Sequence, residues 1–215
     1  MAVKINARGF MGVKRSANIH RDRYVIRFYS KKSDCALQLE TYLEWLLALR
    51  LETNPNVESY AAQPESMHLE ILGKKCRYTP DFLVRYTDGS ERYFEIHHEK
   101  FTTPEYRRRI LDFNYYATST TSVGIELIAS KGIEEHEVEF HNLKLLADNY
   151  LLRPSFKPEQ FTLPETITLG ALIEELKAYT QYPSSEAYTL LTSGLYEYDN
   201  SICINANSVL QRVGS

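Results

Sequence analysis

The sequence has few of the residues that would cross-link it covalently or anchor it in a membrane. Its 215 residues include three cysteines, Cys35, Cys76 and Cys203, and none of them forms a CxxC pair. Widely spaced cysteines in odd number argue against a disulfide framework or a zinc cage, and favour a reducing compartment. No segment approaches the ~20 apolar residues of a membrane-spanning helix. The basic N-terminal segment has no apolar stretch behind it, so we expect no secretory signal and a cytoplasmic protein.

Acidic residues are scarce at the N-terminus. The net charge of the whole chain is -3, which by itself does not favour nucleic-acid binding. Residues 1–32, however, hold nine Lys or Arg and one acid, a net charge of +8, so the remaining residues carry -11. Such a segment is typical of an arm that follows DNA phosphates, but equally of a solubilising tail. Its candidate DNA-binding residues are Arg8, Lys14, Arg15, Arg21 and Arg23.

The hydrophobic pattern predicts a mixed α/β core. A strand over residues 24–29 precedes a helix expected from residue 33 or 34 to about residue 52, because leucines recur there at helical spacing. A hairpin over residues 82–97 turns at Thr87-Asp88-Gly89-Ser90, and Asp-Gly is a strong turn signal. The other expected elements are strands at 57–63 and 67–72, a turn at 73–75, helices at 104–117 and 139–151, and a strand at 124–129.

Prolines predict a boundary after this core. Residues 153–166 contain three prolines and show no strong periodicity, which indicates a linker. The following residues show two helical patterns, at 168–179 and 184–193, and a candidate hairpin at 195–205 that turns at Asp199-Asn200. Two helices and a hairpin suggest a winged-helix module. The predicted parts are a basic arm at 1–32, an α/β domain at 33–152, a linker at 153–166 and a winged-helix-like domain at 167–215.

Three carboxylates occupy positions where an unpaired charge is costly. Glu44 falls beside or within the leucine stripe of the first predicted helix. Asp81 follows Pro80 at the start of a hydrophobic strand, and Glu95 lies near the end of the returning strand, at or diagonal to Asp81. Each also has a structural interpretation, Glu44 as a boundary residue that reaches solvent and the hairpin pair as a polar cross-strand arrangement.

These positions follow a known nuclease pattern. His97 points to the same side as Glu95, because alternate residues of a strand share a face. Carboxylates gathered in this way suit a hard cation such as Mg²⁺ or Mn²⁺. Pro80-Asp81, a hairpin, then Glu95-x-His97, with an upstream helical glutamate, fits the PD-(D/E)xK pattern of restriction-like nucleases, with His in place of the usual Lys. The pattern alone is short and degenerate.

Longer blocks of the sequence resemble the TnsA family, the endonuclease subunits of heteromeric transposases. The blocks are YLEWLLALRLETNPNVESYAAQP, GKKCRYTPDFLVRYTDGSERYFEI, IELIASKGI with NLKLL, and ITLGALIEEL with LLTSGLYEYDNSICINANSVL. They occur in the order found in the family and cover most of the chain from about residue 30 onward. The resemblance implies a restriction-endonuclease-like mixed sheet flanked by helices, followed by a small C-terminal winged-helix-like domain.

The resemblance also implies a role for individual residues. The implied ligands of one or two Mg²⁺ ions, with Mn²⁺ as a substitute, are Glu44, Asp81, Glu95 and the carbonyl of Ile96. His97 stands where the family usually has lysine, and an imidazole with a pKa near 6.5 can act as a base or as a hydrogen-bond donor. Alternatively the site is weakened, or Lys100 reaches in from beyond the strand.

The implied activity is Mg²⁺-dependent hydrolysis of the 5′, non-transferred strand at transposon ends during cut-and-paste transposition. The implied partners are double-stranded DNA at the transposon ends, a TnsB-like transposase and a TnsC-like AAA+ ATPase, in a bacterial cytoplasm. Residues 155–215 hold three basic residues and seven acids, which favours a protein contact, with the ATPase, over DNA. Two alternatives remain open: a catalytically weakened adaptor that bridges transposase and regulator, and a stand-alone restriction or repair nuclease.

Overall fold

The protein consists of two compact units. The computed structural model describes residues 25–71, 73–131, 136–155 and 162–213. The division between the units falls between Glu135 and His136. Within the described residues, no helix combines the length and the apolar character that crossing a membrane would require.

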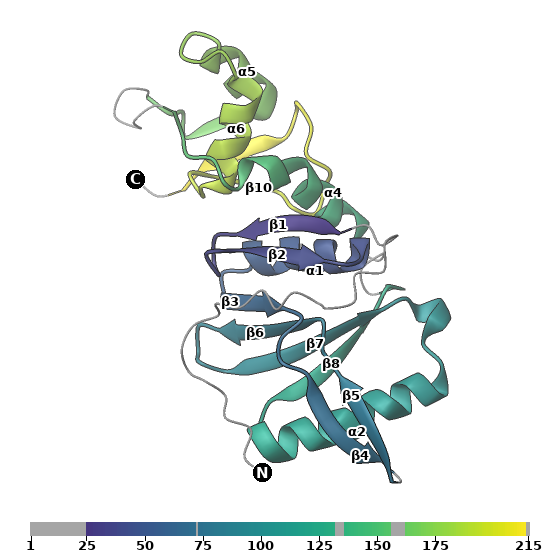
Figure 1. Ribbon diagram of the computed structural model, residues 1–215. Coiled ribbons are helices and arrows are strands. Elements are labelled where there is room, and N and C mark those ends of the chain that lie inside the picture. The colour runs from purple at the N-terminus through teal and green to yellow at the C-terminus, as the bar shows by residue number, and fades with distance from the viewer. Residues whose placement is uncertain (1–24, 72, 132–135, 156–161, 214–215) are drawn as a thin grey trace. The chain divides into compact units, whose positions relative to one another are not determined.

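A four-stranded mixed sheet forms the centre of the first unit (Figure 1). In order across the sheet, its strands are β3 (Val57–Ala62), β6 (Phe82–Tyr86), β7 (Glu91–His97) and β8 (Gly124–Ala129). The pairs β3–β6 and β6–β7 are antiparallel, whereas β7 and β8 are parallel. β6 and β7 form the predicted hairpin with the predicted bounds. Gly89 in its turn has a φ of 82°, a conformation that favours glycine.

Two helices lie on opposite sides of this sheet (Figure 1). Helix α1 (Tyr42–Thr53) is capped by Thr41, and the carboxylate of its Glu52 accepts a hydrogen bond from the Tyr60 hydroxyl of β3 at 2.7 Å. Helix α2 (Pro104–Thr121), which follows the short 3₁₀ helix η1 (Glu99–Phe101), connects β7 to β8. Parallel neighbours require such a long crossover, and two-residue turns cannot make it. The predicted mixed sheet flanked by helices is therefore present.

Two antiparallel hairpins complete the first unit. They are β1 (Ile26–Ser30) with β2 (Cys35–Leu39), and β4 (Met67–Ile71) with β5 (Lys74–Tyr78). The helix expected from residue 33 instead begins at Tyr42, because residues 35–39 pair with β1 and bury the alternate residues Leu37 and Leu39. The turn expected at 73–75 is also wrong beyond Gly73, since Lys74 and Lys75 already pair with β4.

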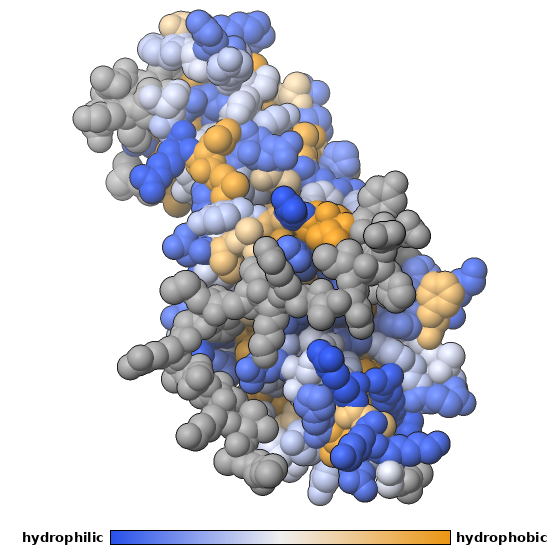
Figure 2. Space-filling view, viewed as in Figure 1, coloured by the Kyte–Doolittle hydropathy of each residue, from blue (hydrophilic) through white to orange (hydrophobic). Residues whose placement is uncertain are grey.

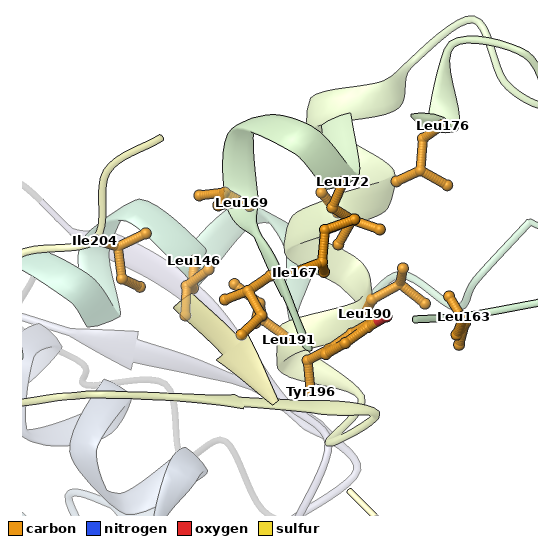
Figure 3. Packing of buried hydrophobic residues seen from close by; sticks show 12 residues of the cluster. Leu146, Leu163, Ile167, Leu169, Leu172, Leu176, Leu190, Leu191, Tyr196 and Ile204 are labelled. Carbon is orange, nitrogen blue, oxygen red and sulfur yellow. The ribbon is translucent and has the colours of Figure 1, made fainter. Parts of the chain in front are cut away.

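The second unit combines helices with a three-stranded antiparallel sheet in the order β10-β11-β9. Its elements are α4 (Glu137–Leu146), η2 (Ala147–Asn149), β9 (Thr166–Thr168), α5 (Leu169–Leu176), α6 (Pro183–Thr192), β10 (Tyr196–Tyr198) and β11 (Val209–Arg212). Figure 3 shows its core, where leucines of both α5 and α6 converge with Tyr196 and with Leu146 of α4. The unit thus has an apolar core of its own.

The second unit differs from the sequence-based expectation in two ways. The helix expected to close the first domain, at 139–151, is α4, and its Leu146 lies in the core of the second unit, so the division precedes α4 rather than falling at 153–166. The hairpin expected at 195–205 is also wrong, because β10 pairs with residues 209–212. The buried side chain of Asn142 binds the intervening segment through the backbone of Ile202 and Ile204, which keeps it out of the sheet.

Candidate active site

Asp81 and Glu95 face each other at one end of the β6–β7 hairpin. The register pairs Phe82 with Phe94, and continuing it by one residue places Asp81 opposite Glu95. The backbone N–H of Ile96 donates a hydrogen bond to Oδ2 of Asp81 at 2.7 Å. Asp81 is therefore fixed against the backbone of β7, beside the glutamate that the sequence paired with it.

Glu44 lies in the first turn of α1, where its side chain is nearly buried at 4% exposure. Its carboxylate accepts hydrogen bonds from the backbone N–H of Glu40 at 2.8 Å and from the Thr41 hydroxyl at 2.9 Å. The Glu44 N–H in turn donates to the Thr41 oxygen at 3.1 Å, as in a capping box. Leu37 lies on β2 and does not belong to the helix. Leu47 and Leu51, three and seven residues after Glu44, are buried on α1, so the carboxylate does lie along the apolar stripe of the helix as predicted.

Two tyrosines hold the carboxylate of Glu95. The hydroxyl of Tyr78, on β5, donates to Oε2 at 2.7 Å, and the hydroxyl of Tyr106, on α2, donates to Oε1. Burial, followed by interaction with Glu95, raises the pKa of both tyrosines, so they remain protonated donors. Sequence reasoning missed them. The available signal was helical spacing, since Tyr106, Ile110 and Phe113 share one face of α2.

His97 lies on the same face of β7 as Glu95, as the alternation of the strand predicted. Its ring stacks on Tyr106 with a centroid distance of 4.1 Å and an interplanar angle of 24°. Its Nδ1 lies 3.0 Å from the hydroxyl oxygen of Thr102. Tyr106 therefore contacts both Glu95 and His97, and the imidazole is held in one orientation with Nε2 as its remaining ring nitrogen.

Burial raises the pKa of all three carboxylates, and the charge of Glu95 adds to this effect at Asp81 and Glu44. Burial first, and the charge of Glu95 second, raise the pKa of Asp81, although the hydrogen bond from Ile96 acts in the opposite direction. Burial, with smaller effects from Glu40 and Glu95, raises the pKa of Glu44. Burial also raises the pKa of Glu95, against the lowering effect of its two tyrosine partners. The effects of Glu95 on Asp81 and Glu44, and of Glu44 on Asp81, indicate that these carboxylates lie close enough together to interact electrostatically.

The candidate donors of this site are carboxylate oxygens, which are the ligands that hard cations prefer. None of the ion pairs found among the described residues involves Glu44, Asp81 or Glu95. Carboxylate oxygens keep further lone pairs after accepting one hydrogen bond, and oxygen ligands are those that Mg²⁺ and Mn²⁺ prefer. In the described part of the chain, no three His, Cys, Asp or Glu side chains are already drawn together closely enough to ligate an ion. A bound cation would therefore have to draw the carboxylates closer.

Five candidate DNA-binding residues cannot be placed near this site. They are Arg8, Lys14, Arg15, Arg21 and Arg23, and all lie outside the described residues. The structure thus places Asp81, Glu95, His97 and the backbone of Ile96 at one end of the β6–β7 hairpin, with Glu44 near enough to affect the pKa of Asp81, and leaves the basic arm as a prediction.

Comparison with known proteins finds a similarity for part of the chain. No curated protein matches the chain. The family model for the TnsA-like endonuclease N-terminal domain matches residues 54–141. This match includes the β6–β7 hairpin with Asp81, Glu95 and His97, and it leaves out Glu44. Residues 54–141 are therefore similar to the TnsA-like endonuclease N-terminal domain.

Proposed function

We propose that this chain is the endonuclease subunit of a heteromeric transposase and hydrolyses the 5′, non-transferred strand at transposon ends with Mg²⁺. The family match supports a DNA endonuclease of the transposase type. The observation that carries the proposal is the group of three buried or half-buried carboxylates, Glu44, Asp81 and Glu95. After burial, the charge of Glu95 raises the pKa of Asp81 and of Glu44, and none of the three forms one of the ion pairs found among the described residues.

In this proposal the three carboxylates and the Ile96 carbonyl would hold Mg²⁺. When bound, the ion supplies Lewis-acid stabilisation of charge at the phosphate and lowers the pKa of water. The Ile96 N–H orients Asp81, and the two tyrosines orient Glu95. His97 can accept or donate a proton at Nε2, because Nδ1 is engaged with Thr102. An imidazole would thus take the position of the usual lysine.

The second unit is proposed to dock a protein partner. The order β9-α5-α6-β10-β11, with two helices followed by two paired strands, supports the expectation of a winged-helix-like module. Its acidic balance disfavours a DNA-gripping face. We therefore propose that the second unit binds the TnsC-like ATPase. The basic N-terminal arm and the carboxylate site would bind the double-stranded DNA of transposon ends. Joint action with a TnsB-like transposase in a bacterial cytoplasm completes the proposal.

Strand-specific cutting tests this proposal. The substitution Glu95→Gln should reduce 5′-strand cleavage of transposon-end DNA by more than about a hundredfold, because removal of even an outer-shell partner of a metal ligand costs 10–100-fold. The assay contains Mg²⁺ and the TnsB-like and TnsC-like partners, and resolves both strands on denaturing gels. Glu91→Gln, on the same strand but paired with Arg85 at the surface, is the matched control and should cut normally.

The same assay separates the alternative functions. Loss of 5′ cutting in Glu95→Gln with 3′ cutting retained supports the active subunit. A wild-type protein that leaves the 5′ ends intact in the complete reaction contradicts the proposal and favours the adaptor, whose weakened site would follow from His97. Efficient cutting by the chain alone, without either partner, would instead favour a stand-alone nuclease.

Tyr106 provides a second prediction, as a positioning residue. Tyr106→Phe removes one donor to Glu95 and keeps the ring that stacks on His97. We expect kcat to fall roughly 10–100-fold with little change in KM for DNA, since outer-shell partners orient a ligand rather than bind substrate. The pH profile of cleavage should also shift, because the hydroxyl lowers the pKa of Glu95.

The control for this prediction lies on the same helix. Tyr115 is 79% exposed, so Tyr115→Phe should leave kcat and the pH profile unchanged. An unchanged pH profile in Tyr106→Phe, accompanied only by lower thermal stability, would show that Tyr106 is structural and does not position Glu95.

A further inference from the structure

The two elements that hold Glu95 also expose a basic surface. On β5, Tyr78 points inward to Glu95, and on α2 Tyr106 does the same. Their neighbours on these elements are exposed cations. The basic surface consists of Lys74, Arg107, Arg108 and Arg109, which line one cavity, while Lys75 and Arg77 are exposed on the other face of β5.

The basic surface is hollowed and internally braced. A cavity of about 820 Å³ lies between β5 and the first turns of α2, lined by residues that include Lys74, Arg107 and Arg108. The guanidinium of Arg109 donates to the carbonyl of Arg77 at 3.0 Å and lies over the ring of Phe113, 5.9 Å from its centroid. Arg109 thus fixes the β4–β5 hairpin to α2, and the other cations are presented on a defined scaffold.

The charge of this surface is unlike that of the chain as a whole. Residues 67–78 and 104–112 carry six Lys or Arg and three acids, whereas the whole chain has a net charge of -3. One of the acids, Asp112, pairs with Arg108 at 3.6 Å. Figure 2 shows mainly hydrophilic side chains, with a small apolar spot, gathered over the end of the first unit where the β4–β5 hairpin lies.

We propose that the basic surface binds the phosphate backbone of the DNA duplex beside the bond that is cut; this assignment rests on the proposed function. Three carboxylates repel a polyanion, so a nuclease needs cations next to them to hold the strand in place. Tyr78 and Tyr106 connect the two features directly, because each lies on the same element as the cations.

Binding to duplex DNA in EDTA, followed by fluorescence anisotropy at several salt concentrations, tests the assignment without cleavage. The full chain is compared with Arg107→Gln/Arg108→Gln, which removes two exposed cations and keeps helix-forming residues. Loss of two phosphate contacts should make the negative slope of log K against log salt shallower by about 1.8. It should also weaken binding roughly tenfold near 0.1 M salt.

The matched control is Arg85→Gln/Arg92→Gln, which removes two cations from surface ion pairs with Glu91 and Glu126. It should bind with the wild-type slope. Equal slopes for wild type and Arg107→Gln/Arg108→Gln, or equal losses in both double variants, would overturn the assignment. Failure of this assignment can be distinguished from failure of the proposed function. A wild type that binds DNA through this surface but never cuts it contradicts only the proposed nuclease activity. A wild type that cuts, with an Arg107→Gln/Arg108→Gln variant that binds DNA equally well, contradicts only the assignment of the surface.

Discussion

Asp81→Asn is expected to abolish DNA cleavage and yet to make the metal-free protein more stable at neutral pH. Cleavage should fall by more than about a hundredfold, because a proposed ligand is removed rather than an outer-shell partner. The amide oxygen of asparagine can still accept the hydrogen bond from Ile96, so the β6–β7 hairpin should remain intact. If removing the charge of Asp81 stabilises the protein and abolishes its activity, then Asp81 is retained for function and not for stability.

The direction of the stability change follows from the pKa of Asp81. Burial and the charge of Glu95 raise this pKa in the folded protein, whereas an unfolded aspartate titrates near 3.9. The folded state therefore binds the proton more tightly, and wild-type stability falls as the pH rises from about 4 through the raised pKa. The variant lacks this loss, so its advantage should be largest above the raised pKa and should vanish below about pH 4.

Thermal unfolding in EDTA at several pH values measures this difference. The control is Asp88→Asn on the same hairpin, where hydrogen bonds from Ser90 lower the pKa of an exposed carboxylate, so its substitution should not stabilise the protein. Adding Mg²⁺ or Mn²⁺ should raise the wild-type midpoint and leave Asp81→Asn nearly unchanged. A metal-free Asp81→Asn protein that is less stable than wild type at pH 7.5 would contradict our account of the carboxylates.

Glu52→Ala should destabilise the first unit by about 2–4 kcal/mol, since it removes the acceptor from several buried or half-buried donors. The Glu52 carboxylate is 8% exposed and accepts hydrogen bonds from the Ser30 and Tyr60 hydroxyls, each at 2.7 Å. It also accepts the backbone N–H groups of Lys31 at 2.8 Å and Lys32 at 3.2 Å. One side chain of α1 thus holds the β1–β2 turn and β3 together.

Urea unfolding monitored by tryptophan fluorescence measures this effect. The chain has one tryptophan, Trp45, and it lies on α1, so the signal reports on the first unit. Glu58→Ala, at an exposed position on β3, is the control and should change the free energy of unfolding by less than about 0.5 kcal/mol. If Glu52→Ala also changed the free energy of unfolding by less than about 0.5 kcal/mol, water would have to satisfy the donors that Glu52 binds, and the prediction would be wrong.

Local signals predicted the hairpin that carries the site. The bounds of β6, β7 and β8 agree with the sequence-based prediction because alternating burial and an Asp-Gly turn act over a few residues. The same alternation predicted that Glu95 and His97 share a face, and their common contact with Tyr106 confirms it. The approach of Asp81 to Glu95 also followed from the hairpin.

Pairings between distant segments were not predictable from these signals. Leu37 fits a helical stripe as well as a strand, and only pairing with β1 decides the outcome. The apolar helix face that contains Leu146 could pack in either domain as far as its own sequence shows. Its place in the core of the second unit depends on distant residues such as Leu190. The tyrosines of Glu95 come from β5 and α2, on opposite sides of β7 in the sequence, so no local pattern joins them.

The crossover through α2 determines when the site can be complete during synthesis. Glu95 is enclosed by Tyr78, which precedes it in the chain, and by Tyr106, which follows it. A ribosome releases the chain from the N-terminus, so the carboxylate reaches its final surroundings only after α2 has emerged and β8 has joined the sheet. A chain interrupted after β7 contains all three carboxylates but lacks Tyr106. The arrangement therefore keeps an unfinished chain from assembling the full surroundings of Glu95.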